Sequence, residues 1–143
     1  FAALLLSASR VASPFGALAG GLLTLKLGTR RTLYFGLTVY SLALAGMSLP
    51  HFAPFAAGMF AQPFFTAMIF PPLFTMLAES FPLREQPVLL GIGMPIASLF
   101  GVGLMPGILG MFGDYASFNT GFLCMGCLAA CSMLLIRGIP AGK

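Results

Sequence analysis

Arg10 is a cation inside an apolar segment, in the stretch SASRVASPFG. A guanidinium among apolar groups is costly unless it faces protein or water, and its planar donor fork fits carboxylate, nitrate or phosphate groups. Residues at three- and four-residue spacing share one side of a helix, and here that side is small and polar: Ser7, Pro14, Ala17 and Gly21. We therefore interpret Arg10 as an anion-binding residue, with an arginine that extends to a polar interface as the alternative.

Three further polar side chains interrupt long apolar runs. Gln62 and Thr66 lie four residues apart, so one helical face carries both, and Ser98 lies in a separate run. An amide or a hydroxyl can hydrogen-bond a bound solute, or it can join neighbouring helices in lipid. Our candidate binding residues are therefore Arg10, Gln62, Thr66 and Ser98, with helix–helix contacts as the alternative for Gln62 and Thr66.

The other reactive side chains form no catalytic or metal-binding pattern. Cys124, Cys127 and Cys131 read CMGCLAAC inside an apolar run, and neither a histidine nor a fourth cysteine accompanies them. Such cysteines usually behave as small hydrophobic residues. Because paired acids, a Ser–His pair, a phosphate loop and a zinc pattern are all missing from the sequence, we expect no enzyme, no cofactor and no metal site.

The composition indicates a protein that folds in lipid. Of the 143 residues, 59% are hydrophobic and only 7% are charged, whereas a soluble domain carries roughly 25% charged residues. The net charge is +4, but the cations lie between apolar blocks, which disfavours a nucleic-acid partner. The chain opens inside an apolar segment without a methionine, so we expect a piece of a longer protein.

Charge-free runs predict an all-α membrane protein, a polytopic bundle of about five helices. Acidic and basic residues are absent from 32–78, 86–113 and 115–136, and a membrane helix needs about 20 apolar residues. Turn and charge signals divide the chain into helices at 2–25, 32–49, 54–80, 88–112 and 116–136.

The loops of this bundle differ in charge. Alternating sides place all the loop cations together: Lys26, Arg30, Arg31, Arg84, Arg137 and Lys143. Cations collect on the cytoplasmic side of a membrane. We therefore expect a multi-pass protein of a bacterial inner (plasma) membrane with its C-terminus in the cytoplasm.

The first turn, GGLLTLKLGTRRTL at residues 20–33, carries the most specific pattern. Gly28 allows a sharp turn, and the cations around it hold that turn against anionic headgroups. The spacing resembles the loop pattern G-x-x-x-D-[RK]-x-G-[RK]-[RK] of the major facilitator superfamily. The matching residues are Gly21, Lys26, Gly28 and Arg30, while Leu25 replaces the acid and Thr29 replaces one cation. Loss of the acid resembles the second copy of this pattern, between helices eight and nine.

Two later stretches support the same resemblance. LAESFPLREQPVLLGIG is similar to the family's passage from helix ten to eleven, and GLMPGILGMFGDYASFNTGF to the passage from eleven to twelve. The resemblance implies that residues 1–143 are part of the C-terminal six-helix half, covering helices eight to twelve. Helices eight, ten and eleven of this family help to line a central cavity, and Arg10, Gln62, Thr66 and Ser98 fall on them.

The resemblance also implies a function. Two halves of such a transporter rock about a central site, which gives alternating access and secondary active transport of a small solute. Arg10 favours an organic or inorganic anion. The loop residues Gly21, Lys26, Gly28, Arg30 and Arg31 would stabilise one conformation. The implied partners are the solute, the lipid bilayer, the N-terminal half of the same chain and a coupling proton or ion.

Alternatives to this interpretation remain. A non-transporting helical membrane protein, such as an assembly factor or receptor, would carry Arg10 at an interface. Prolines interrupt the third helix at Pro71 and Pro72, and the fourth at Pro95 and Pro106. With the glycines of the fourth helix they predict either a flexible gate or close static packing against neighbouring helices, and packing alone would explain the glycines.

Overall fold

The computed structural model describes residues 7–138, and this part of the chain consists of helices joined by short turns. The helices are α2 (Ala12–Leu27), α3 (Thr29–Met47), α4 (Phe52–Ser80), α5 (Gln86–Ser98), α6 (Met105–Tyr115) and α7 (Phe118–Gly138), with a π-helical segment, η1 (Leu99–Leu104), between α5 and α6. No strand occurs between residues 7 and 138. The predicted all-α fold class is therefore confirmed.

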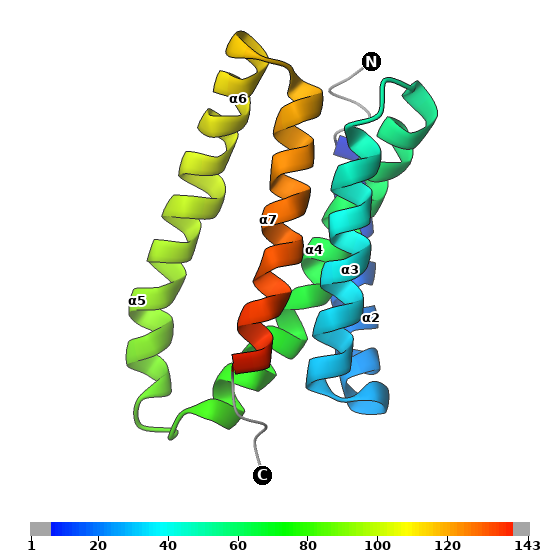
Figure 1. Cartoon of the computed structure of the whole chain (residues 1–143). Coiled ribbons are helices and arrows are strands. Elements are labelled where there is room, and N and C mark those ends of the chain that lie inside the picture. Colours follow the sequence, from blue (N-terminus) through cyan, green and yellow to red (C-terminus); the bar gives the residue numbers. More distant parts are fainter. Residues whose placement is uncertain (1–6, 139–143) are drawn as a thin grey trace.

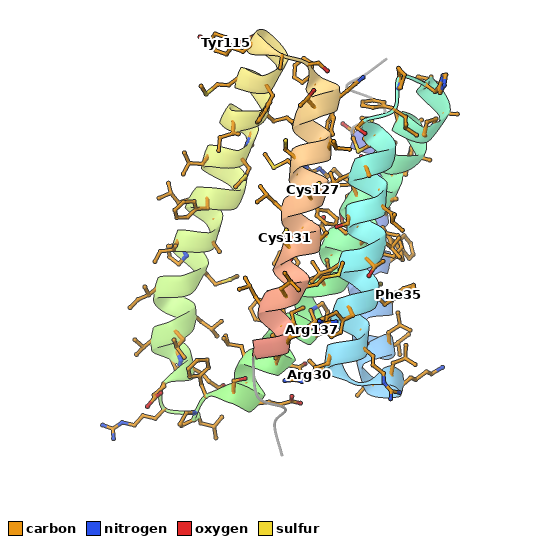
Figure 2. All side chains as sticks on the ribbon, viewed as in Figure 1. Arg30, Phe35, Tyr115, Cys127, Cys131 and Arg137 are labelled. Atoms are coloured by element: carbon orange, nitrogen blue, oxygen red, sulfur yellow. The ribbon has the colours of Figure 1, made fainter. Side chains whose placement is uncertain are left out.

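The helices run up and down, so that the turns gather at two ends (Figure 1). The turn between α2 and α3, the 81–85 loop and the last residues of α7 lie at one end. The cations of these segments therefore lie together there, as Figure 2 shows for Arg30 and Arg137. We call this the basic end. The remaining members of that set are Lys26, Arg31 and Arg84, while Lys143 lies outside the described residues.

The start of α2 differs from the predicted helix at 2–25. Residues 7–10 are helical, Val11 lies in a turn, and α2 begins at Ala12. Pro14 explains the interruption, because proline has no N–H to donate to the carbonyl four residues earlier, that of Arg10. Arg10 is therefore helical, as expected, but it ends a helical segment that is separated from α2 by Val11. Residues 2–6 of the predicted helix lie outside the described part of the chain.

The other helix bounds lie within three residues of the expected ranges, and the helix expected at 88–112 is a rod made of α5, η1 and α6. Within residues 7–138, three helices are long and apolar enough to cross a membrane, namely Phe52–Ser80, Gln86–Tyr115 and Phe118–Gly138. α2 has 16 residues, which is below the usual spanning length. α3 has 19 residues but carries two arginines in its first turn. That α2 and α3 also span the membrane remains a prediction.

α2 packs against α4 through a pair of glycines in the stretch GALAG. A Cβ added at Gly16 would overlap the carbonyl oxygen of Phe64, and one at Gly20 would overlap that of Met68. Pro72 cannot donate an N–H to the Met68 carbonyl, which leaves this oxygen available to face the neighbouring helix. Small residues four positions apart commonly allow such close helix approach in membranes.

α3 lies between α4 and α7 and packs against both helices. Its buried residues include Leu33, which is 1% exposed, and Leu44. The hydroxyl of Ser41 donates a hydrogen bond of 3.0 Å to the carbonyl of Gly126 on α7, and a Cβ at Gly126 would lie 3.2 Å from the Ser41 carbonyl oxygen. α3 and α7 are therefore joined by backbone proximity as well as by apolar contact.

The rod formed by α5, η1 and α6 stands beside this core (Figure 1). None of the residues of α5 is buried. The rod reaches the core through α6, where Leu109 and Phe112 pack over Gly121 of α7. Gly113 packs against the Phe118 ring of α7. The rod's earlier glycines do not mediate this packing, because no atom lies within 4 Å of a Cβ added at Gly91, Gly93, Gly101, Gly107 or Gly110. The expectation that they pack closely against neighbours is therefore wrong for this arrangement.

The π-helical segment marks a change of register in the rod. The N–H of Met105 donates to the carbonyl of Phe100, five residues earlier, and Pro106 follows with no N–H to continue the α-helical ladder. A π-turn holds one more residue than an α-turn. Residues after η1 are therefore rotated about the helix axis relative to those before it.

Gly28 forms the turn between α2 and α3, as expected from the sequence, with φ of 86° and ψ of 158°. Residues with a Cβ rarely adopt this backbone conformation. We therefore expect Gly28→Ala to destabilise the full-length protein by about 1–3 kcal/mol. Thermal unfolding in detergent measures this as a lower midpoint. Gly107→Ala is the control, since it lies in open helical surface and should keep or slightly raise the midpoint. Equal midpoints for the two variants would contradict the assigned turn.

Candidate functional site

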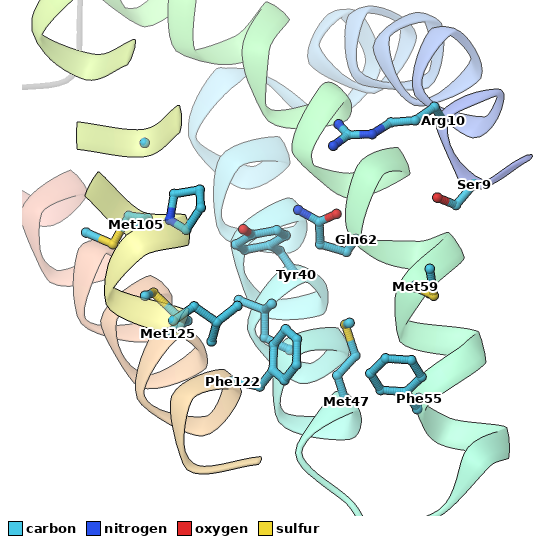
Figure 3. A pocket seen from close by; sticks show the side chains of 14 residues that line it. Ser9, Arg10, Tyr40, Met47, Phe55, Met59, Gln62, Met105, Phe122 and Met125 are labelled. Carbon is cyan, nitrogen blue, oxygen red and sulfur yellow. The ribbon is translucent and has the colours of Figure 1, made fainter. Parts of the chain in front are cut away.

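A cavity of about 730 Å³ lies between the residues just before α2, the second half of α3, the first part of α4, and the facing parts of the rod and α7 (Figure 3). Its volume falls in the range of small-molecule sites, about 300–1,000 Å³. It has a polar part and an apolar part. The polar side chains of its wall are Ser9, Arg10, Tyr40 and Gln62.

The polar part joins three different elements. Figure 3 shows the guanidinium of Arg10, the amide of Gln62 and the ring of Tyr40 toward one end of the cavity. Ser9 is 2% exposed and lies beside Arg10 at the entrance of the chain into α2. Arg10 lies just before α2, and α3 supplies Tyr40 from its middle.

The charge of Arg10 is not balanced inside the cavity. The chain has three acidic residues, and none of them lines the wall. Glu79 lies near the end of α4, Glu85 precedes α5 and Asp114 lies near the end of α6. A guanidinium that faces a cavity without a neighbouring carboxylate attracts an anion, and it can bind one with two parallel hydrogen bonds.

Thr66 does not line the cavity but contacts a residue that does. The Gln62 side-chain nitrogen Nε2 donates to Thr66 Oγ1 at 3.4 Å, and the Thr66 hydroxyl donates to the Gln62 backbone carbonyl at 2.7 Å. The hydroxyl therefore bonds within its own helix, as threonine commonly does in apolar helices, and it also orients the amide of Gln62.

Ser98 lies away from the cavity. It is the last residue of α5 and is exposed, whereas Gly101, three residues on, belongs to the cavity wall. The change of register in η1 accounts for the difference, because the face that points inward after η1 differs from the face that carries Ser98. The structure thus brings Arg10 and Gln62 together, with Thr66 behind Gln62.

Several residues of the wall had not been identified from the sequence. Tyr40 was overlooked because it lies in a helix expected outside the central cavity, although a tyrosine in the middle of an apolar helix is itself a signal. Six of the ten apolar residues of the wall have sulfur or aromatic side chains: Met47, Phe55, Met59, Met105, Phe122 and Met125. Nine methionines in 143 residues were the available hint of such a surface.

The loop residues of the first turn lie at the basic end, remote from the cavity. Lys26 and Arg31 are exposed, and a Cβ added at Gly21 would meet no atom within 4 Å. Arg30 differs, because its Nη2 is buried and has no hydrogen-bond partner. A buried donor without an acceptor is costly, so this nitrogen needs an acceptor that residues 7–138 do not supply.

The cysteines of α7 lie along one face of that helix. Cys127 and Cys131, labelled on α7 in Figure 2, are exposed, and Cys124 is half-buried. Among the residues from 7 to 138, no group of three or more His, Cys, Asp or Glu side chains could hold a metal ion.

Long apolar helices, their cations gathered at one end, define a polytopic helical membrane protein. The family model of the Major Facilitator Superfamily matches residues 1–142. The chain therefore belongs to the Major Facilitator Superfamily, which confirms the resemblance drawn from its loops. Comparisons with curated proteins and with solved structures gave no match. Members of this family are membrane transporters of small solutes, and the chain is accordingly an integral, multi-pass membrane protein.

Proposed function

We propose that this chain forms most of the C-terminal half of a secondary active transporter that carries an anion by alternating access. One observation supports this proposal most directly: Arg10 faces a ligand-sized cavity whose wall holds no acid. An internal carboxylate would neutralise the guanidinium and leave little attraction for a solute. With none in the wall, the bound solute itself supplies the negative charge.

The donors around Arg10 suit an anionic group. The Arg10 guanidinium offers several N–H donors, the Gln62 amide offers two and the Tyr40 hydroxyl offers one. Thr66 restrains the Gln62 amide, so less rotational freedom is lost when the solute binds. We assign direct contacts with the anion to Arg10, Gln62 and Tyr40, and a supporting role to Thr66. We assign Ser98 no contact with the anion, because it lies outside the cavity wall.

The basic end has a separate role in this proposal. We assign it to the cytoplasm, because cations are retained on that side, in the inner membrane of a bacterium. The turn residues Gly21, Lys26, Gly28, Arg30 and Arg31 stabilise one conformation of the transporter. The buried and unpaired Nη2 of Arg30 supports this role, since a contact with the other half of the transporter would supply the missing acceptor.

Counterflow in proteoliposomes tests the proposal. The full-length protein is reconstituted with an unlabelled anion inside, and entry of the same labelled anion is followed for nitrate, phosphate, small carboxylates and organic sulfonates. We expect transient accumulation of at least one anion, and none for matched organic cations. Vesicles without protein give the background. Accumulation of cations alone would overturn the anion assignment, and no counterflow of any solute would favour a non-transporting membrane protein.

A further inference from the structure

The cavity is mostly apolar, although its cation would suffice to hold a small anion. Figure 3 shows Met47, Phe55 and Phe122 toward the end opposite to Arg10 and Gln62, with Met105 and Met125 along the side formed by α6 and α7. Thioether sulfur is only a weak hydrogen-bond acceptor. This part of the wall therefore offers a solute contact area but almost no polar bonding.

The cavity is much larger than a small inorganic anion. Its volume is about 730 Å³, whereas one water molecule occupies about 30 Å³, and nitrate or phosphate is only a few times larger. Such an ion at Arg10 would leave the apolar part of the wall in contact with water. A solute that fills the cavity must place apolar atoms against the methionines and aromatic rings.

Two contacts shape the apolar part. The rings of Phe55 on α4 and Phe122 on α7 meet edge to face, with centroids 6.3 Å apart. This pair joins two helices at the end of the cavity that is remote from Gln62 and Tyr40 (Figure 3). Met47 is 7% exposed and packs over Gly58 of α4, so its side chain forms a fixed part of the wall.

We infer that the anion taken by this site is amphipathic: a carboxylate-, sulfonate- or phosphate-type group at Arg10 and Gln62, joined to an aromatic or branched apolar body. The inference rests on the proposed function, since it adds the apolar body to the anion already assigned. The body lies between the Phe55–Phe122 pair and the thioethers of Met59 and Met125. Methionine side chains are flexible and polarisable, so the wall accepts apolar bodies of several shapes.

A pair of labelled sulfonates tests the inference. Sulfonates stay ionised and cross lipid slowly, so methanesulfonate and 1-naphthalenesulfonate share one head group and differ in the apolar body. Binding of each to the purified full-length protein in lipid nanodiscs is measured by scintillation proximity. We expect naphthalenesulfonate to bind at least about tenfold more tightly than methanesulfonate, because apolar surface leaves water only with the larger ligand.

Variants locate the contact. Glutamine nearly matches methionine in shape but exposes an amide to the apolar body, so Met59→Gln with Met125→Gln should weaken naphthalenesulfonate binding by about tenfold. The same double variant should leave methanesulfonate binding unchanged. Met111→Gln is the matched control, since Met111 is 59% exposed on α6 and lies outside the cavity wall. It should alter neither affinity.

The outcomes separate this inference from the proposed function. If the two sulfonates bind equally tightly and both weaken in Arg10→Gln, the anion site stands and the amphipathic solute is wrong. If naphthalenesulfonate binds more tightly but the methionine variants do not change its affinity, the apolar body lies elsewhere and the inference is also wrong. If Arg10→Gln changes the affinity for neither sulfonate, the proposed anion site itself is wrong.

Discussion

Replacing Arg10 with glutamine should lower the affinity of the full-length transporter for its anion by about 10- to 100-fold. Hydrogen bonds to a charged group contribute about 1.5–3 kcal/mol, and each 1.4 kcal/mol is about a factor of ten in the dissociation constant. Glutamine keeps a polar side chain of moderate length but removes the charge and the planar donor fork. Arg10→Lys keeps the charge but not the donor fork, so its affinity for the anion should lie between those of the wild-type protein and Arg10→Gln.

The matched control for this experiment is Arg84→Gln. It removes the same charge from the exposed 81–85 loop, on the side of the bundle remote from the cavity, and should leave anion affinity as it is. The dissociation constants follow from concentration-dependent counterflow or from equilibrium binding. Unchanged affinity in Arg10→Gln, with folded and correctly inserted protein, would mean that Arg10 is an interfacial residue and not a ligand of the solute.

Gly20→Leu should prevent the full-length protein from accumulating in a folded form. A Cβ at this position would already overlap the carbonyl oxygen of Met68, so α2 and α4 would have to separate along their contact. Inserting atoms into a packed interface typically costs about 1–3 kcal/mol, and here backbone atoms cannot move aside as a side chain would. Gly20→Ala should therefore still fold, but with a clearly lower unfolding midpoint.

Gly21 gives the matched control, because it neighbours Gly20 in sequence and meets no atom within 4 Å. Gly21→Ala should keep or raise the unfolding midpoint, since alanine favours helix over glycine by about 1 kcal/mol. For the alanine and leucine variants at Gly20 and Gly21, size-exclusion profiles in detergent measure the amount of monodisperse protein, and thermal unfolding measures the midpoint. A similar loss of monodisperse protein for Gly20→Leu and Gly21→Leu would contradict the assigned contact with α4.

The existence of the helices was predictable, because lipid imposes strong constraints on a sequence. A spanning helix must keep charges out of about 20 residues, so the charge-free runs place α4, the α5–α6 rod and α7. Gly28 and its neighbouring cations likewise mark the first turn. The interruption at Val11 was missed, although Pro14 signals it once the lost N–H of proline is traced to its i−4 carbonyl.

The contacts between helices were less predictable, because an apolar helix offers similar side chains on all faces. The sequence pointed to the glycines of the rod as packing residues, whereas Gly16 and Gly20 make the closest approach. Pro72 adds to one of these two contacts, because it leaves the Met68 carbonyl without its helical N–H donor. Its effect on the Met68 carbonyl appears only when α2 and α4 are placed side by side.

The candidate site was partly predictable, because lipid also constrains where polar side chains can lie. Arg10 and Gln62 could be identified because polar groups in lipid need a partner. Ser98 satisfied the same rule, yet the register change in η1 places it away from the cavity. Tyr40 and the methionines left weaker signals in the sequence, because apolar and weakly polar side chains are common in membrane helices, and the geometry was needed to place them in the wall.

The two kinds of glycine contact in this bundle impose different rules on divergence within the family. At Gly16 and Gly20 the opposing atoms belong to the backbone of α4, so no exchange of a partner side chain makes room. These positions should stay small without a correlated partner. At Gly113 the opposing atoms belong to the Phe118 ring, so a larger residue there can be accommodated by a smaller one at 118. Related sequences should therefore show covariation between positions 113 and 118. Positions 16 and 20 should show none, because the contact with the α4 backbone tolerates no larger residue there.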